Sequence, residues 1–180
     1  MSKEILISKR DGRKEPLELD KLHKVVFHAC ADITGVSESE VEIKSHIQFY
    51  TGITSAEIQE TLIKSAADLI TEETPNYQFV AGRLINYHLR KQVYGTFTPP
   101  CLCDIIQDNI NRGFYDAEIL ELYTKDEIDE LSDYIVHERD ESLTYAAMEQ
   151  FRGKYLVQNR NTGEIFETPQ VAYMLISATR

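Results

Sequence analysis

Residues 5–19 read Ile5-Leu6-Ile7-Ser8-Lys9-Arg10-Asp11-Gly12-Arg13-Lys14-Glu15-Pro16-Leu17-Glu18-Leu19, two strand-like runs on either side of an Asp-Gly pair. Asp-Gly between such runs predicts a β-hairpin with a type I′ turn, because both central residues of that turn need positive φ. Pro16 lacks a backbone N–H, so the second strand is expected at a sheet edge. Asp20 is a candidate N-cap for a helix that follows at once.

Four helices are predicted between the hairpin and residue 95. The first runs from Asp20 to Gly35, with apolar residues at helical spacing. Capping boxes at Ser37–Glu40 and Thr54–Glu57 open the second and third, and Gly52 ends the second. Thr74-Pro75 starts a long fourth helix that Gly95 stops. Residues 1–95 are therefore expected to form an α+β domain: a short hairpin plus a four-helix unit.

Residues 96–180 are predicted to be a second, mostly helical region behind the Pro99-Pro100 linker. Helices are expected over Cys101–Gly113, from a capping box at Thr124–Glu127, and over Ser142–Arg152. A hairpin is predicted around residues 159–163, and Thr168-Pro169 begins a last helix. The apolar pattern of this helix stops abruptly at Arg180, so we expect a fragment of a longer chain.

Charge and composition exclude several classes of protein. The 180 residues hold 30 Asp+Glu and 19 Lys+Arg, a net charge of −11, which argues against general nucleic-acid binding. No apolar run is long enough for a membrane span or a signal peptide. Three Cys without framework spacing fit a reducing, cytoplasmic setting. The acidic stretch 116–133 is interpreted as a solvated helix face.

Basic residues gather early, which makes the hairpin the candidate anion site. Residues 1–95 have a net charge of −2, against −9 for residues 96–180. None of the eight Gly forms a Rossmann or P-loop motif, so a phosphate site must come from side chains. Lys9, Arg10 and Lys21 can converge there, joined by Arg90 and Lys91 if the fourth helix packs back. The alternative is that they are ordinary surface cations. Neither a metal site nor a catalytic site is expected.

Longer motifs resemble the N-terminal part of class I ribonucleotide reductase large (alpha) subunits of the enterobacterial and phage type. Lys9-Arg10-Asp11-Gly12 with Glu15 and Asp20-Lys21 resembles the opening hairpin of the family's ATP cone. The stretches 45–50 and 75–95 are similar to helices of the same domain. Residues 153–165 resemble the lead-in to the catalytic α/β barrel. The resemblance spans the chain.

The resemblance implies allosteric control of deoxyribonucleotide synthesis. The cone would bind ATP, an activator, or dATP, an inhibitor, with Mg²⁺ accompanying the phosphates. The implied partners are the rest of the large subunit, in a homodimer, and the small radical-generating (beta) subunit. Matching the motif residue by residue assigns the nucleotide site to Lys9, Arg10, Glu15, Pro16, Leu17, Glu18, Leu19, Asp20, Lys21, Ser55, Gln59 and Lys91.

Two departures from the family pattern matter. Ser55 replaces a more frequent Thr and keeps the hydroxyl, whereas Gln59 replaces the His of close relatives, so discrimination between ATP and dATP is expected to be weaker. Cys30, Cys101 and Cys103 match none of the catalytic cysteines, so the chain as given is expected to be inactive. The alternative function is a free-standing ATP/dATP-sensing module. A cone repressor would carry a zinc ribbon ahead of the cone, which disfavours that alternative.

Overall fold

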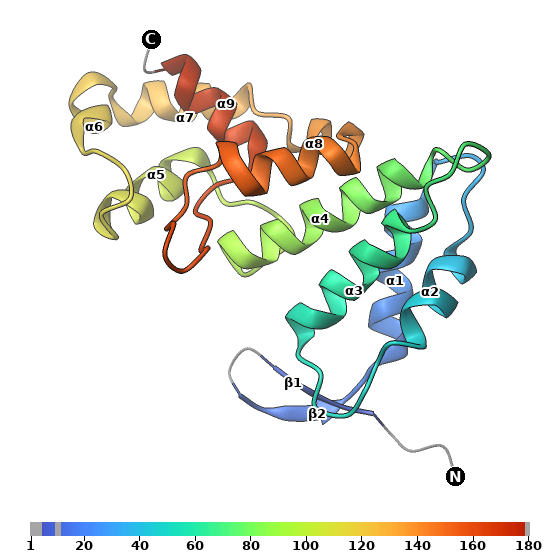
Figure 1. Ribbon diagram of the computed structural model, residues 1–180. Helices are drawn as coiled ribbons and strands as arrows, with labels where there is room; N and C mark the ends of the chain where they lie inside the picture. Colours follow the sequence, from blue (N-terminus) through green and yellow to red (C-terminus); the bar gives the residue numbers. More distant parts are fainter. Residues whose placement is uncertain (1–4, 10–11, 179–180) are drawn as a thin grey trace. The chain divides into compact units, whose positions relative to one another are not determined.

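The computed structural model describes residues 5–9 and 12–178 (Figure 1). Its described part is mostly helical with one short antiparallel hairpin, which confirms the α+β class. The elements are β1 (Leu6–Ser8), β2 (Lys14–Pro16), α1 (Leu19–Cys30), α2 (Glu38–His46), α3 (Ser55–Ala67), α4 (Tyr77–Tyr94), α5 (Leu102–Asn111), α6 (Glu118–Leu122), α7 (Lys125–Asp133), a 3₁₀ helix η1 (His137–Ser142), α8 (Tyr145–Gln150), a π-helical turn η2 (Phe151–Tyr155) and α9 (Pro169–Ala178).

The chain forms two compact units. The first unit takes in the described residues up to His88 together with Leu143–Met148. The second unit takes in Leu89–Ser142 and the described residues from Glu149 onward. Helix α4 therefore contributes residues to both units. The division into domains 1–95 and 96–180 stays a prediction.

The hairpin forms with a longer loop than expected. Ile7 pairs with Glu15 at the centre of the register. Gly12, at φ +82°, donates its N–H to the Lys9 carbonyl at 2.9 Å, and the Lys9 N–H donates to Arg13 at 2.8 Å. This pattern is typical of a three-residue loop with glycine in the left-handed region, so the two-residue turn is wrong. The expectation for Asp11 itself lies outside the described residues.

Strand β1 has a second neighbour that the sequence did not reveal. The Ser8 N–H donates to the Ile53 carbonyl at 2.9 Å, and the Gly52 N–H donates to the Leu6 carbonyl at 2.7 Å. Ser8 and Thr54 pair in parallel, so β1 is flanked by β2 on one side and by residues 52–54 on the other. Pro16 thus lies in an edge strand, as predicted, and the start of α3 comes to lie beside Lys9.

Two of the predicted capping boxes are confirmed. Thr54 and Thr124 each accept a bond from the backbone N–H three residues on, and Glu57 and Glu127 reach back to the cap N–H. The box at Ser37 is wrong, because Ser37 is the N-cap of α2 without a side-chain bond.

The hydroxyl of Tyr77 takes over this helix end. It accepts a hydrogen bond from the Ser37 N–H at 2.9 Å and donates to the carboxylate of Glu40. Tyr77 is buried and its pKa is raised to about 12, mainly by burial and by this carboxylate. A side chain 37 residues away therefore holds Glu40 and keeps it from capping.

Several predicted helix ends were displaced. Helix α1 begins at Leu19, so Asp20 is inside its first turn and Glu18 is the N-cap. Helices α1 and α2 end at Cys30 and His46, before the glycines that were expected to stop them. Gly95, at φ +73°, does terminate α4, with its N–H bonded to Lys91 at 3.2 Å. A glycine marks a turn, but the helix ends earlier where further turns intervene.

The core of the first unit lies between its helices. The fully buried side chains include Val26, Val41, Leu62 and Leu84, one from each of α1 to α4. The unit also contains the start of α8, where a Cβ added to Gly82 would lie 2.1 Å from the Leu143 carbonyl oxygen. The two backbones therefore meet in direct contact at Gly82.

The second unit has its own core and two elements that were not predicted, α6 and η1. Leu102, Ile105, Ile106, Ile119, Ile128 and Val171 form a buried cluster. The Asn159 N–H donates to Glu164 at 2.8 Å and the Phe166 N–H to Val157 at 3.0 Å. Among the described residues this hairpin forms only a single bridge, Gln158 with Ile165, rather than two strands.

A buried carboxyl in the second unit predicts a pH-dependent stability. Asp140 accepts a bond from the Gln170 amide at 3.0 Å, and burial raises its pKa to about 6. The folded state therefore binds this proton more tightly than the unfolded state, whose carboxyl ionises near pH 4. Stability from this group is full below that pH and is lost as pH rises toward 6, by at most about 3 kcal/mol.

Substitution of Asp140 isolates this contribution. Asp140→Asn keeps the acceptor for Gln170 but removes the ionisation. In urea unfolding at pH 4 to 7, the variant should gain stability relative to the parent chain as pH rises. Asp133→Asn removes an exposed carboxylate and serves as control. A difference between Asp140→Asn and the parent that stays constant over this range contradicts the prediction.

Candidate nucleotide site

The candidate site lies where β1, β2 and the starts of α1 and α3 meet. Strand β2 ends at Pro16 and α1 begins at Leu19, so only a short connection separates the hairpin from the first helix. The parallel pairing of Ser8 with Thr54 places the residues that follow them, Lys9 and Ser55, next to each other. Three segments distant in sequence are therefore held together by backbone hydrogen bonds.

Charged side chains on the hairpin converge on Glu15. The Lys9 ammonium lies 2.7 Å from its carboxylate, and both side chains are about 30% exposed. The pKa of Glu15 is lowered from its usual range, first by the Lys9 hydrogen bond and further by the charges of Lys21 and Arg13. Cations from both strands and from α1 therefore act on one carboxylate.

Lys21 has a second carboxylate partner. Its ammonium lies 2.8 Å from the Glu18 carboxylate, and both side chains are largely exposed. The pKa of Lys21 is raised, first by the Glu18 hydrogen bond and to a smaller extent by Glu15. An exposed ion pair of this kind adds little to stability, so neither residue is held here by a requirement of the fold.

The N-terminus of α3 completes the positive surface. Ser55 is the first residue of the helix and is half-buried, and Gln59 follows one turn later on the same face. The N–H groups of a first helical turn carry partial positive charge and favour anions. The Thr54 capping box fixes the direction in which this helix starts.

The remaining predicted site residues have different positions. Pro16 to Asp20 form the end of β2, the connection and the first turn of α1. Lys91 belongs to the second unit, where its ammonium lies 4.6 Å from the centroid of the Phe97 ring. Arg10 lies outside the described residues. The assignment of all these residues to a nucleotide site stays a prediction.

Residues 52–54 and Arg13 were missed by the sequence reasoning. Arg13 was not a site candidate, yet its charge acts on Glu15. Ile53 is buried between Gly52 and the capping box, and this short extended stretch was the available signal for a strand partner. Pairing between segments 45 residues apart cannot be deduced from local patterns.

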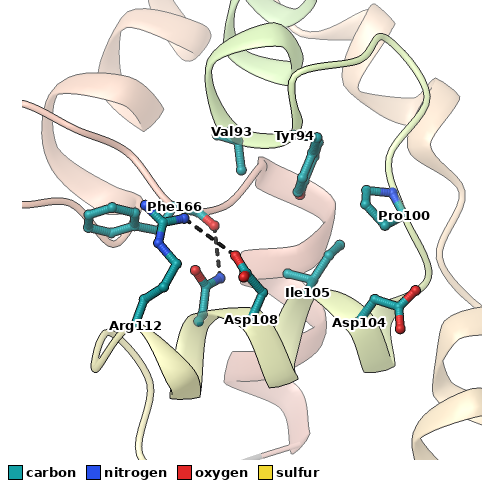
Figure 2. Close-up of a pocket in the computed structure, with 9 residues that line it drawn as sticks. Val93, Tyr94, Pro100, Asp104, Ile105, Asp108, Arg112 and Phe166 are labelled. Carbon is teal, nitrogen blue, oxygen red and sulfur yellow. Dashed lines mark hydrogen bonds and ion pairs between the residues drawn. The ribbon is translucent and has the colours of Figure 1, made fainter.

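A separate cavity of about 300 Å³ lies in the second unit (Figure 2). Its lining combines apolar side chains with Asp104, Asp108, Asn109 and Arg112 of α5. The Arg112 guanidinium lies 3.4 Å from Asp108 and 2.6 Å from Glu164, and the Asn109 amide donates to the Phe166 carbonyl at 3.0 Å. These polar groups bond to one another, so they link α5 to the 159–166 turn.

Other kinds of site find little support in the described part of the chain. No three His, Cys, Asp or Glu side chains gather there in a set that could bind a metal ion. No described helix is both long and apolar enough to span a membrane.

Comparison with known proteins identifies the first part of the chain. Residues 5–92 match the family model of the ATP cone domain, and this segment is an ATP cone. The match covers the hairpin, the starts of α1 and α3, and Lys91.

The whole chain is similar to alpha subunits of ribonucleoside-diphosphate reductase. It is 48% identical to subunit alpha 1 of Salmonella typhimurium over 99% of this chain and 23% of that protein. The subunit alpha of Haemophilus influenzae is 48% identical over 99% of this chain and 24% of its own length. That of Enterobacteria phage T4 is 40% identical over 96% and 23%. The chain thus spans about a quarter of the length of these relatives.

Proposed function

We propose that this chain is the N-terminal regulatory region of a ribonucleoside-diphosphate reductase alpha subunit, and that its first unit binds ATP or dATP. The observation that carries the proposal is the ATP cone at residues 5–92, whose hairpin cations converge on one place. Similarity to alpha subunits continues through the second unit, which favours this function over a free-standing nucleotide sensor.

The proposed site binds a triphosphate without a glycine-rich loop. Lys9, Arg10 and Lys21 supply the positive charge, and the N–H groups at the start of α3 supply further donors. Mg²⁺ accompanies the phosphates and is bound mainly by them. The connection from Pro16 to Asp20 lines the base and sugar, and Lys91 closes the site.

Regulation follows from the single hydroxyl that distinguishes ATP from dATP. An effector shifts a conformational equilibrium only by its difference in affinity for the two states. A site that hydrogen-bonds the ribose therefore allows the two nucleotides to favour different states and to switch the enzyme on or off. The proposed partners are the remainder of the alpha subunit, a second alpha subunit and the small radical-generating subunit, in the cytoplasm.

The first test is the effect of ATP on thermal stability. A ligand that binds only the folded state, present at about a hundredfold excess over its Kd, stabilises that state by about 2.7 kcal/mol. The first unit should therefore melt several degrees higher with millimolar Mg-ATP than without it. Mg-GTP at the same concentration controls for general anion effects. Identical melting curves with and without ATP contradict the proposed function.

A second test concerns Gln59. A glutamine offers a donor and an acceptor but no positive charge, whereas a histidine presents a ring that can be protonated. We expect Gln59→His to widen the ratio between ATP and dATP affinities, measured by competition with a fluorescent nucleotide. Gln48→His, on another loop of the first unit, is the control substitution. An unchanged ratio shows that position 59 does not govern discrimination.

A further inference from the structure

The candidate site contains as many carboxylates as it has described lysines. Lys9 is paired with Glu15 at 2.7 Å, and Lys21 with Glu18 at 2.8 Å. Both glutamates lie within three residues of each other, at the end of the hairpin and the start of α1. A surface selected only to attract phosphate would not keep acidic side chains on its two lysines, because those carboxylates repel the incoming anion.

Helix capping does not account for Glu18. It occupies the N-cap position of α1, yet its side chain makes no capping bond and turns to the Lys21 ammonium instead. Glu57 at the start of α3 behaves differently, since its carboxylate accepts bonds from the N–H and the hydroxyl of Thr54. The same residue type thus serves structure in one place and only neutralises a lysine in the other.

Glu15 likewise lies where its charge opposes a ligand. It is opposite Ile7 in the register, so it shares a face of the hairpin with Ile7 and Lys9. Ile7 is buried on that face, and Lys9 and Glu15 lie at its half-exposed edge. Because Lys21 and Arg13 also act on this carboxylate, Glu15 is the shared counterion of three cations.

We propose that Glu15 and Glu18 are built-in counterions that hold the lysines of the empty site and weaken its affinity for nucleoside triphosphates. A triphosphate binds by displacing the two carboxylates from Lys9 and Lys21. This exchange keeps the Kd higher than the lysines alone would set it. A weaker site stays sensitive to changes in nucleotide concentration instead of remaining saturated. The inference rests on the nucleotide site proposed above.

The test is titration calorimetry of Mg-ATP into the complete 180-residue chain and its charge-neutral variants. Glu15→Gln and Glu18→Gln each should lower the Kd by about three- to tenfold at low ionic strength, since each removes one negative charge near the phosphates. The gain should shrink in 0.5 M salt, where screening is strong. Melting curves without ligand confirm that each variant is folded.

Asp68→Asn is the matched control. Asp68 is exposed at the opposite end of α3 from Ser55, about 20 Å away, and its carboxylate lies 3.9 Å from Lys44. This variant has the same net charge as the other two and should bind ATP like the parent. If Glu15→Gln and Glu18→Gln leave the Kd unchanged or raise it while Lys9→Ala abolishes binding, the counterion role is overturned and the site stands. If the parent chain itself binds no ATP, the proposed function fails first.

Discussion

Gly82→Ala is expected to destabilise the first unit by about 2–4 kcal/mol, although alanine is the better helix former. Gly82 lies inside α4, where the backbone of Leu143 and Thr144 packs directly against it. An added Cβ would lie 2.1 Å from the Leu143 carbonyl oxygen and 3.0 Å from the Thr144 carbonyl carbon. Both are backbone atoms, so no side-chain rotation relieves the overlap and the start of α8 must move.

Equilibrium unfolding in urea measures this effect, with far-ultraviolet circular dichroism as the signal. Gly153→Ala is the control, because a Cβ at Gly153 meets no atom within 4 Å and its φ is not in the left-handed region. That variant should stay within about 0.5 kcal/mol of the parent chain. A Gly82→Ala protein as stable as the parent would show that the contact with Leu143 does not persist in solution.

Lys9→Ala and Lys21→Ala are each expected to weaken ATP binding by about 10- to 150-fold. A hydrogen bond to a charged group contributes about 1.5–3 kcal/mol, which corresponds to that range of Kd. Stability should change by no more than about 0.5 kcal/mol, because both lysines take part in ion pairs that are at least partly exposed. The loss of binding therefore separates from any loss of folding.

Lys14→Ala is the control for this pair. Lys14 carries the same charge and lies in the same hairpin, but it is the neighbour of Glu15 in β2 and so points to the opposite face. It should bind ATP within about threefold of the parent, as expected for a screened charge. Equal losses in all three variants would mean that net charge, and not a defined site, attracts the nucleotide.

Local signals in the sequence were sufficient for much of the fold. The capping boxes at Thr54 and Thr124 were predicted because both partners lie within four residues of each other. The third box failed because Tyr77, a distant residue, hydrogen-bonds both Ser37 and Glu40. Short elements such as α6 and η1 were missed, since five or six residues carry too little periodicity to be recognised.

The candidate site was predictable to the same extent. Lys9 and Lys21 were expected to converge because a hairpin and the helix that follows it are adjacent along the chain. The pairing of Ser8 with Thr54 and the contact of Gly82 with Leu143 depend on tertiary structure, and no local pattern contains them. The two glutamates were assigned to the site by resemblance, but their ion pairs with the lysines appeared only in the structure.

The most direct test of the nucleotide site is a calorimetric titration of Mg-ATP into the 180-residue chain, repeated with the Lys9→Ala/Lys21→Ala double variant. We predict saturable heat with the parent chain, displacement of bound ATP by dATP, and no measurable heat with the folded double variant. The absence of heat and of competition by dATP with the parent chain at millimolar nucleotide would contradict the assignment. Equal binding by the parent and the double variant would contradict it as well.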